Sequence, residues 1–169
     1  ERQALTNLRT LYARLRQKFP NAELFLASDA HTIQWRSNSP FTLDVSAFVT
    51  AVTNAQTATD WRVAMELYRG PLLPHWYDEW LEPERDRLHQ LFFYAGERLL
   101  ELQENQRDFE AAIHTAQLLL RQDPLHEATY RRLMHAQAQN GEKVAALRTY
   151  HICVKLLDKE LGVALDEPT

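Results

Sequence analysis

The chain has 169 residues, of which 45% are hydrophobic and 25% are charged, as in ordinary globular domains. This composition excludes a collagen-like fibre and a disordered tail. The single cysteine, Cys153, excludes an intrachain disulfide, and no apolar stretch approaches the roughly 20 residues that cross a bilayer. With no signal-peptide pattern and no cysteine framework, the chain is expected to be cytoplasmic and to have no membrane partner.

The net charge of −4 is distributed unevenly along the chain. Residues 1–36 include six basic and three acidic side chains, whereas residues 37–169 include 13 basic and 20 acidic ones. The first segment therefore carries a net positive charge, and the second would on average repel a polyanion such as nucleic acid.

An amphipathic helix is predicted over residues 1–19, before Pro20 and Asn21. Six apolar side chains on one side of it predict a buried stripe: Leu5, Leu8, Leu11, Tyr12, Leu15 and Phe19. Arg2, Arg9 and Arg16 recur every seven residues on the other side. This basic face is either a solvated helix surface or a surface that contacts DNA phosphates and base edges.

Two short runs typical of β-strands follow at residues 24–27 and 32–35, on either side of a turn at 28–31. In winged-helix proteins a recognition helix enters the major groove, and the hairpin after it, the wing, contacts an adjacent groove or the backbone. The candidate DNA contacts are Arg2, Thr6, Asn7, Arg9, Thr10, Arg14, Arg16, His31 and Arg36. The cationic side chains and His31 would contact phosphates, and Thr6, Asn7 and Thr10 would contact bases.

The remainder of the chain is predicted to be helical, without strands. The expected helices cover residues 45–57, 61–68, 80–105, 108–121, 125–139 and 142–160. Asp44 and Asp60 are the expected N-caps of the first two. Pro83 is tolerated because it falls in the first turn of its helix.

A repeat of 34 residues relates the later helices. The segment at 111–113 recurs at 145–147, and the same shift relates Leu99 to Leu133 and Gln103 to Gln137. This spacing is that of the tetratricopeptide (TPR) repeat, and three degenerate repeats are expected. Leu100 and Met134 occupy positions that are usually small in such repeats, so the helix packing angles are expected to differ from the consensus.

Several short motifs in this order resemble the SARP-type bacterial transcriptional activators. They are NLR at 7–9, RLRQ at 14–17, FTLDV at 41–45 with Phe48, LYRGPLL at 67–73, Trp80, Glu84-Arg85, DPLHE at 123–127, RLM at 132–134 and ELGV at 160–163. In that family a response-regulator-type winged helix precedes a TPR-like bacterial transcriptional activator domain.

The resemblance implies a mainly α fold: residues 1–40 are the recognition helix and wing of a partial winged-helix DNA-binding domain, and residues 41–169 are the TPR-like domain. It also implies that Glu1 lies at or near the start of the recognition helix, so that the earlier winged-helix elements are absent from this chain. The apolar stripe of residues 1–19 is then expected to pack on the rest of the chain or on a second copy, and a homodimer is one expected outcome.

No pattern in the sequence predicts catalysis. The seven histidines show no short-spaced ligand pair, and there is no glycine-rich phosphate loop or nucleophile elbow. We therefore expect neither a metal, nor a cofactor, nor an enzyme activity. Cys153 is expected to be a buried structural thiol on the inward side of the last helix, together with Leu147, Tyr150 and Leu157.

The aromatic segment at 72–80 allows two interpretations. Trp80 and Leu73 are expected in the core between the first helix pair and the long helix, whereas Trp76 and Tyr77 could be presented to a protein partner. Four arginines, Arg85, Arg87, Arg131 and Arg132, lie either on solvated helix faces or at a contact with another protein or domain.

Two functions remain open at this point. The favoured one is a transcription regulator that binds duplex DNA through the complete winged helix and docks on RNA polymerase, a regulatory domain or a second copy through its repeats. The alternative is a TPR-like protein-interaction scaffold that does not bind DNA. Joint substitution of Arg9 and Arg16 would discriminate them, because only the regulator would lose DNA affinity.

Overall fold

A computed structural model of the chain describes residues 2–29, 32–36 and 38–161. Over these residues it contains eight α-helices, one 3₁₀ turn and two short β-strands, which confirms the predicted mainly α fold. The chain divides into two compact units, Glu1–Thr42 and Leu43–Thr169. Each unit is described by itself.

The N-terminal unit consists of a helix followed by a small hairpin. It contains α1 (Arg2–Lys18), α2 (Ala22–Phe25), β1 (Leu26–Ser28) and β2 (Ile33–Trp35). The strands are antiparallel, with Leu26 opposite Trp35 and Ser28 opposite Ile33. The hairpin is therefore confirmed, but its first strand begins later than residue 24 because residues 22–25 form a helical turn.

A row of contacting aromatic rings, rather than a layered core, joins the elements of this unit. Phe19, Phe25, Trp35 and Phe41 contact one another in that order, with ring centroids 5.3, 5.8 and 5.1 Å apart. Among the described residues of the unit, Ala22 alone is fully buried.

The apolar stripe of α1 is not buried as predicted. Leu5, Leu8, Leu11 and Leu15 are all exposed. Each strand has three residues and spans about 10 Å, whereas the 17 residues of α1 span about 25 Å, so the hairpin is too short to cover the helix. Only Tyr12 and Phe19 of the stripe are half-buried.

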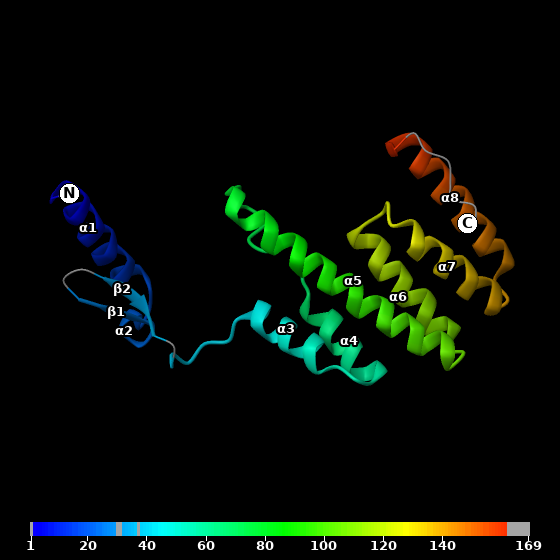
Figure 1. Cartoon of the computed structure of the whole chain (residues 1–169), viewed down its shortest axis with the longest axis horizontal. Coiled ribbons are helices and arrows are strands. Elements are labelled where there is room, and N and C mark those ends of the chain that lie inside the picture. The colour runs from blue at the N-terminus through cyan, green and yellow to red at the C-terminus, as the bar shows by residue number, and fades with distance from the viewer. Residues whose placement is uncertain (1, 30–31, 37, 162–169) are drawn as a thin grey trace. The chain divides into compact units, whose positions relative to one another are not determined.

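The C-terminal unit is a succession of helices, each packed against the next (Figure 1). Its elements are α3 (Asp44–Asn54), α4 (Ala58–Leu67), the 3₁₀ turn η1 (Glu79–Leu81), α5 (Glu82–Asn105), α6 (Phe109–Gln122), α7 (Glu127–Gln139) and α8 (Lys143–Leu161). They form three helix pairs, as the TPR-like interpretation predicts, and no strand occurs within residues 43–161.

Two of the predicted helix starts are displaced. The N-cap of α4 is Thr57, whose hydroxyl accepts a hydrogen bond from the Asp60 backbone N–H while the Asp60 carboxylate accepts one from the Thr57 N–H. Asp60 is thus the third helical residue of a capping box rather than the cap. Asp44 is the first residue of α3, and Leu43 occupies its N-cap position.

At one pair of equivalent positions, the two repeats place the large side chain on opposite helices. In α5, a Cβ atom at Gly96 would lie 2.5 Å from Leu119 Cδ2 of α6, so only glycine allows this approach. The positions 34 residues later are Tyr130 in α7 and Cys153 in α8, which share a buried cluster. The large residue is therefore on the second helix of one pair and on the first helix of the next.

Two of the four residues predicted on the inward face of α8 are exposed. Cys153 and Leu157 are buried as expected, but Leu147 and Tyr150 are exposed. Thr149 is buried instead, because positions 149, 153 and 157 share one side of a helix and position 147 does not.

Candidate functional site

α1 carries six of the candidate DNA contacts on the surface of the N-terminal unit. They are Thr6, Asn7, Arg9, Thr10, Arg14 and Arg16, and all are exposed. Arg2 begins the helix, but its side chain lies outside the described residues, as does the whole of His31. The helix therefore presents one continuous polar and cationic face.

The side chains on this face differ in their local partners. Arg9 and Arg14 form no ion pair with any described residue, whereas Arg16 lies 5.9 Å from the centre of the Tyr12 ring in a cation–π contact. Thr10 donates its hydroxyl to the Thr6 carbonyl at 3.0 Å. Seven residues of α-helix rise about 10 Å, so Arg9 and Arg16 are far enough apart to contact separate phosphate groups.

Arg36 is held against the hairpin. Its backbone N–H donates to the Phe25 carbonyl at 2.7 Å, and its Nε donates to the Leu26 carbonyl at 3.5 Å. The side chain remains exposed at the end of β2. Arg36 is thus a cation exposed beside the hairpin.

The second candidate surface is the aromatic loop, residues 72–81. Trp76, Tyr77 and Trp80 are 57%, 87% and 69% exposed, and Leu73 is exposed as well. The prediction that Trp80 and Leu73 lie in the core is therefore wrong. Leu81 is buried instead of Trp80, because the 3₁₀ turn η1 directs Leu81 inward and leaves Trp80 exposed.

Arg85 of α5 holds the aromatic loop in place. Its Nε donates to the Leu72 carbonyl at 2.8 Å, and its Nη2 donates to the carbonyls of Leu73 and Trp76, each at 2.6 Å. Its Nη1 pairs with Glu82 at 2.6 Å. The side chain is only 15% exposed, so Arg85 is a structural residue rather than part of a solvated face.

Exposed carboxylates lie close in sequence to the exposed aromatic residues. Asp78 and Glu79 lie in the loop and Asp86 lies in the first turns of α5, all exposed and without an ion pair among the described residues. Arg87 pairs with Glu84 at 2.7 Å, and this hydrogen bond lowers the pKa of Glu84. The loop thus combines apolar rings with unpaired negative charge.

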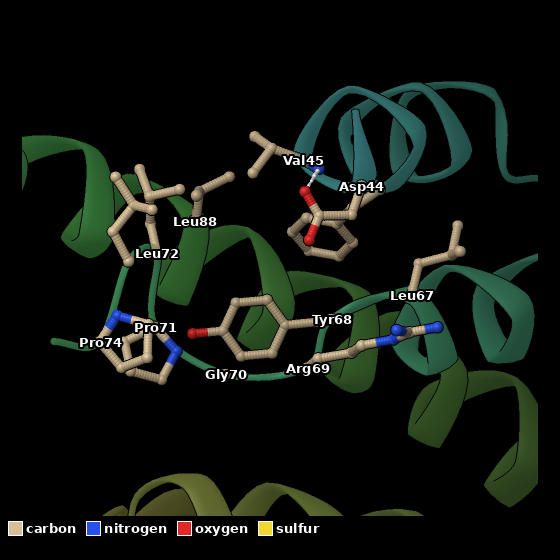
Figure 2. Close-up of a pocket in the computed structure, with 12 residues that line it drawn as sticks. Asp44, Val45, Leu67, Tyr68, Arg69, Gly70, Pro71, Leu72, Pro74 and Leu88 are labelled. Atoms are coloured by element: carbon tan, nitrogen blue, oxygen red, sulfur yellow. Dashed lines mark hydrogen bonds between the residues drawn. The ribbon is translucent and has the colours of Figure 1, made fainter. Parts of the chain in front are cut away.

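A pocket of about 380 Å³ lies at the base of the aromatic loop. Figure 2 shows the Tyr68 hydroxyl directed toward Pro71 and Pro74 across it. The Tyr68 ring lies 4.6 Å from the Phe92 ring, and burial raises the pKa of Tyr68. Since its lining is mainly apolar, the pocket anchors the loop on the helices and shows no acid–base pair suited to catalysis.

The family of the C-terminal unit is decided by comparison with known families. The sequence profile described as "Bacterial transcriptional activator domain" matches residues 43–169. The chain belongs to this family. The match confirms the resemblance for the helical-repeat part, which is called the activator domain from here on. No curated protein matches the chain.

Arg132 stabilises the packing of the activator domain. Its Nε and Nη2 donate to both carboxylate oxygens of Glu104 at 3.0 and 2.8 Å, and its Nη1 donates to the Glu97 carbonyl at 3.2 Å. These bonds join α7 to α5, so Arg132 is not a solvated residue. Arg131 is half-buried and makes no ion pair with a described residue.

The activator domain buries its cysteine. Cys153 is inaccessible in α8, and burial raises the pKa of its thiol, which keeps the sulfur protonated and unreactive. Among the described residues, no group of three or more His, Cys, Asp or Glu is arranged to hold a metal ion. No described helix combines the length and hydropathy needed to cross a membrane.

Proposed function

We propose that the chain is part of a bacterial transcription regulator in which α1 contacts duplex DNA and the activator domain contacts a protein of the transcription machinery. One observation carries the proposal: an exposed row of arginines on a helix–hairpin unit stands on the same chain as a bacterial transcriptional activator domain. The proposed role is non-catalytic.

Phosphate neutralisation is the proposed task of Arg2, Arg9, Arg14, Arg16 and Arg36. Arg9 and Arg14 support it best, since they are exposed and have no described acidic partner to displace. Thr6, Asn7 and Thr10 on the same helix are the proposed base contacts, and His31 is a proposed phosphate contact of the wing.

DNA binding is tested by titrating promoter duplex at several salt concentrations. The protein should include any residues encoded before Glu1, because the resemblance implies that a complete winged helix begins earlier. The double variant Arg9→Gln/Arg16→Gln should lose affinity, and its salt slope should be shallower by about two.

The matched control is Arg69→Gln/Arg148→Gln, which removes two exposed arginines of the activator domain. It should leave both affinity and salt slope unchanged. Equal loss in the two double variants would contradict the proposed role of α1. No DNA binding by the wild-type protein would favour the alternative, a TPR-like interaction scaffold, which the exposed aromatic loop also suits.

The aromatic loop is the proposed docking surface for a protein with exposed cations. Trp76, Tyr77 and Trp80 offer ring faces for cation–π contacts, and the unpaired Asp78 and Glu79 favour a positively charged partner. RNA polymerase, a regulatory domain and a second copy of the chain are the candidate partners.

Purified RNA polymerase provides the first direct test of docking. Trp76→Ala/Tyr77→Ala should weaken its binding to the protein by at least tenfold, as expected for aromatic anchors. The control Val144→Ala/Ile152→Ala removes exposed apolar side chains from α8 and should have no effect. Unchanged binding by the loop variant would exclude polymerase docking through the aromatic loop.

A further inference from the structure

A second, larger cavity lies in the activator domain between α4, α5 and α6. This groove has a volume of about 830 Å³, within the range of small-molecule sites. Its floor is apolar and is formed by Met65, Phe92, Leu99 and Leu118. No residue of the aromatic loop or of α1 lines the groove, although Tyr68 lines both the groove and the pocket at the base of the loop, so nothing in the proposed function uses the groove.

One buried polar group in the groove has no partner. Gln103 lines the groove and is only 9% exposed, and its Oε1 is itself inaccessible and accepts no hydrogen bond from any described residue. Thr115 also lines the groove and is 2% exposed, with no hydrogen bond from its hydroxyl to a described residue. A buried acceptor without a partner is costly, so its retention requires an explanation.

The next repeat contains the same two residues in a closed arrangement. A shift of 34 positions relates Gln103 to Gln137 and Thr115 to Thr149. There the Thr149 hydroxyl donates to Gln137 Oε1 at 2.9 Å, and both side chains are buried. The glutamine–threonine pair is thus satisfied internally in one repeat and left open in the repeat that lines the groove.

We propose that the groove is a binding site for a neutral, mainly apolar small molecule that donates an O–H or N–H to Gln103. The apolar floor favours such a molecule, and the buried amide would fix its orientation. The lining carries both signs of charge, Arg62 and Arg121 against Glu66, Asp108 and Glu110, so the two signs nearly balance and the net attraction for an ion is small.

A small molecule fits these features better than a docked helix does. Gln103 Oε1 is inaccessible as the side chain stands, so a donor meets it only when the amide turns toward the groove. A compact polar group at the bottom of the groove reaches that position better than a side chain on a wide helix does. The ligand site does not depend on DNA binding or on the aromatic loop, and its test is independent of theirs.

The probe for the test is N-phenyl-1-naphthylamine, a neutral aromatic amine with one N–H, whose fluorescence rises in apolar surroundings. The whole chain should bind one dye molecule saturably. Gln103→Leu should weaken binding about five- to tenfold, the effect of losing one hydrogen bond, and the control Gln90→Leu on the exposed side of α5 should not.

A blocking variant tests the location of the dye. His114→Trp places a large side chain on the exposed edge of the groove and should abolish binding, whereas His135→Trp makes the same change on α7 outside the groove and should preserve it. Ala111→Trp provides a second blocking variant, and circular dichroism confirms that each variant is folded.

Four results would overturn the proposal. The first is the absence of saturable binding, and the second is equal binding by the His114→Trp and His135→Trp variants. The third is dye binding that survives both blocking variants but is lost in Leu8→Glu, because the dye would then occupy the exposed leucines of α1. Binding of an amphipathic peptide in place of the dye, blocked by the same variants, would also reject a small-molecule site.

Discussion

Arg85→Met should loosen the aromatic loop and reduce the stability of the activator domain by about 2–3 kcal/mol. The substitution keeps an apolar stem but removes three hydrogen bonds to the carbonyls of Leu72, Leu73 and Trp76. Each is charge-assisted, and because the loop is near solvent the freed carbonyls regain part of their hydrogen bonding with water, leaving a net loss of about 0.5–1 kcal/mol per bond. Arg85→Lys should restore little of it, because an ammonium cannot reproduce the guanidinium fork.

The assay is urea unfolding followed by circular dichroism, together with hydrogen exchange of the Trp76 amide, which donates to the Leu73 carbonyl at 3.0 Å. The control is Arg87→Met, two residues along the same helix, whose guanidinium makes only a half-exposed pair with Glu84. It should change stability by less than about 0.5 kcal/mol. Equal effects of the two variants, or an unchanged exchange rate at Trp76 in Arg85→Met, would refute the role assigned to Arg85.

Three further predictions follow from the helix contacts. Gly96→Ala should destabilise the domain by about 1–3 kcal/mol in urea unfolding, because the new Cβ would overlap Leu119. Thr149→Val should cost about 1–3 kcal/mol because it leaves a buried amide oxygen unpaired, whereas Thr115→Val breaks no described hydrogen bond and should stay within about 0.5 kcal/mol. The pKa of Asp60 is lowered by its capping hydrogen bonds, so the stability advantage of wild type over Asp60→Asn should be constant above about pH 5 and shrink below about pH 4 in urea titrations. A pH-independent difference would contradict this.

The helices could be predicted because their ends carry local signals. Asp108 is the N-cap of α6 and Asn105 ends α5, both where the sequence analysis places them. The start of α4 could not be chosen in advance, since Thr57 and Asp60 are both good cap residues and form a single capping box. The choice between Trp80 and Leu81 depends on the register of a 3₁₀ turn, which hydrophobicity does not encode.

The residues of a candidate surface could be predicted only where they recur at a regular spacing in the sequence. The basic face of α1 follows from arginines spaced seven residues apart, but the exposure of its leucines depends on how much the hairpin covers. The structural role of Arg85 could not be predicted, because Arg85 bonds to backbone carbonyls 9–13 residues earlier and a carbonyl has no sequence signature. The same holds for Arg132, whose carboxylate partner lies 28 residues away.

The 34-residue period identifies equivalent positions without fixing what each position does. Gly96 faces Leu119 in one helix pair, and Tyr130 shares a cluster with Cys153 in the next. The larger side chain is on the second helix of the first pair and on the first helix of the next, and the space between the helices is filled in both. The polar pair beside these layers has identical residues in both repeats, yet only Gln137 and Thr149 are bonded. Since the paired residues and their spacing are the same, the difference must come from the surrounding packing. The open pair is therefore set by the local packing around Gln103 and Thr115 rather than by the repeat itself.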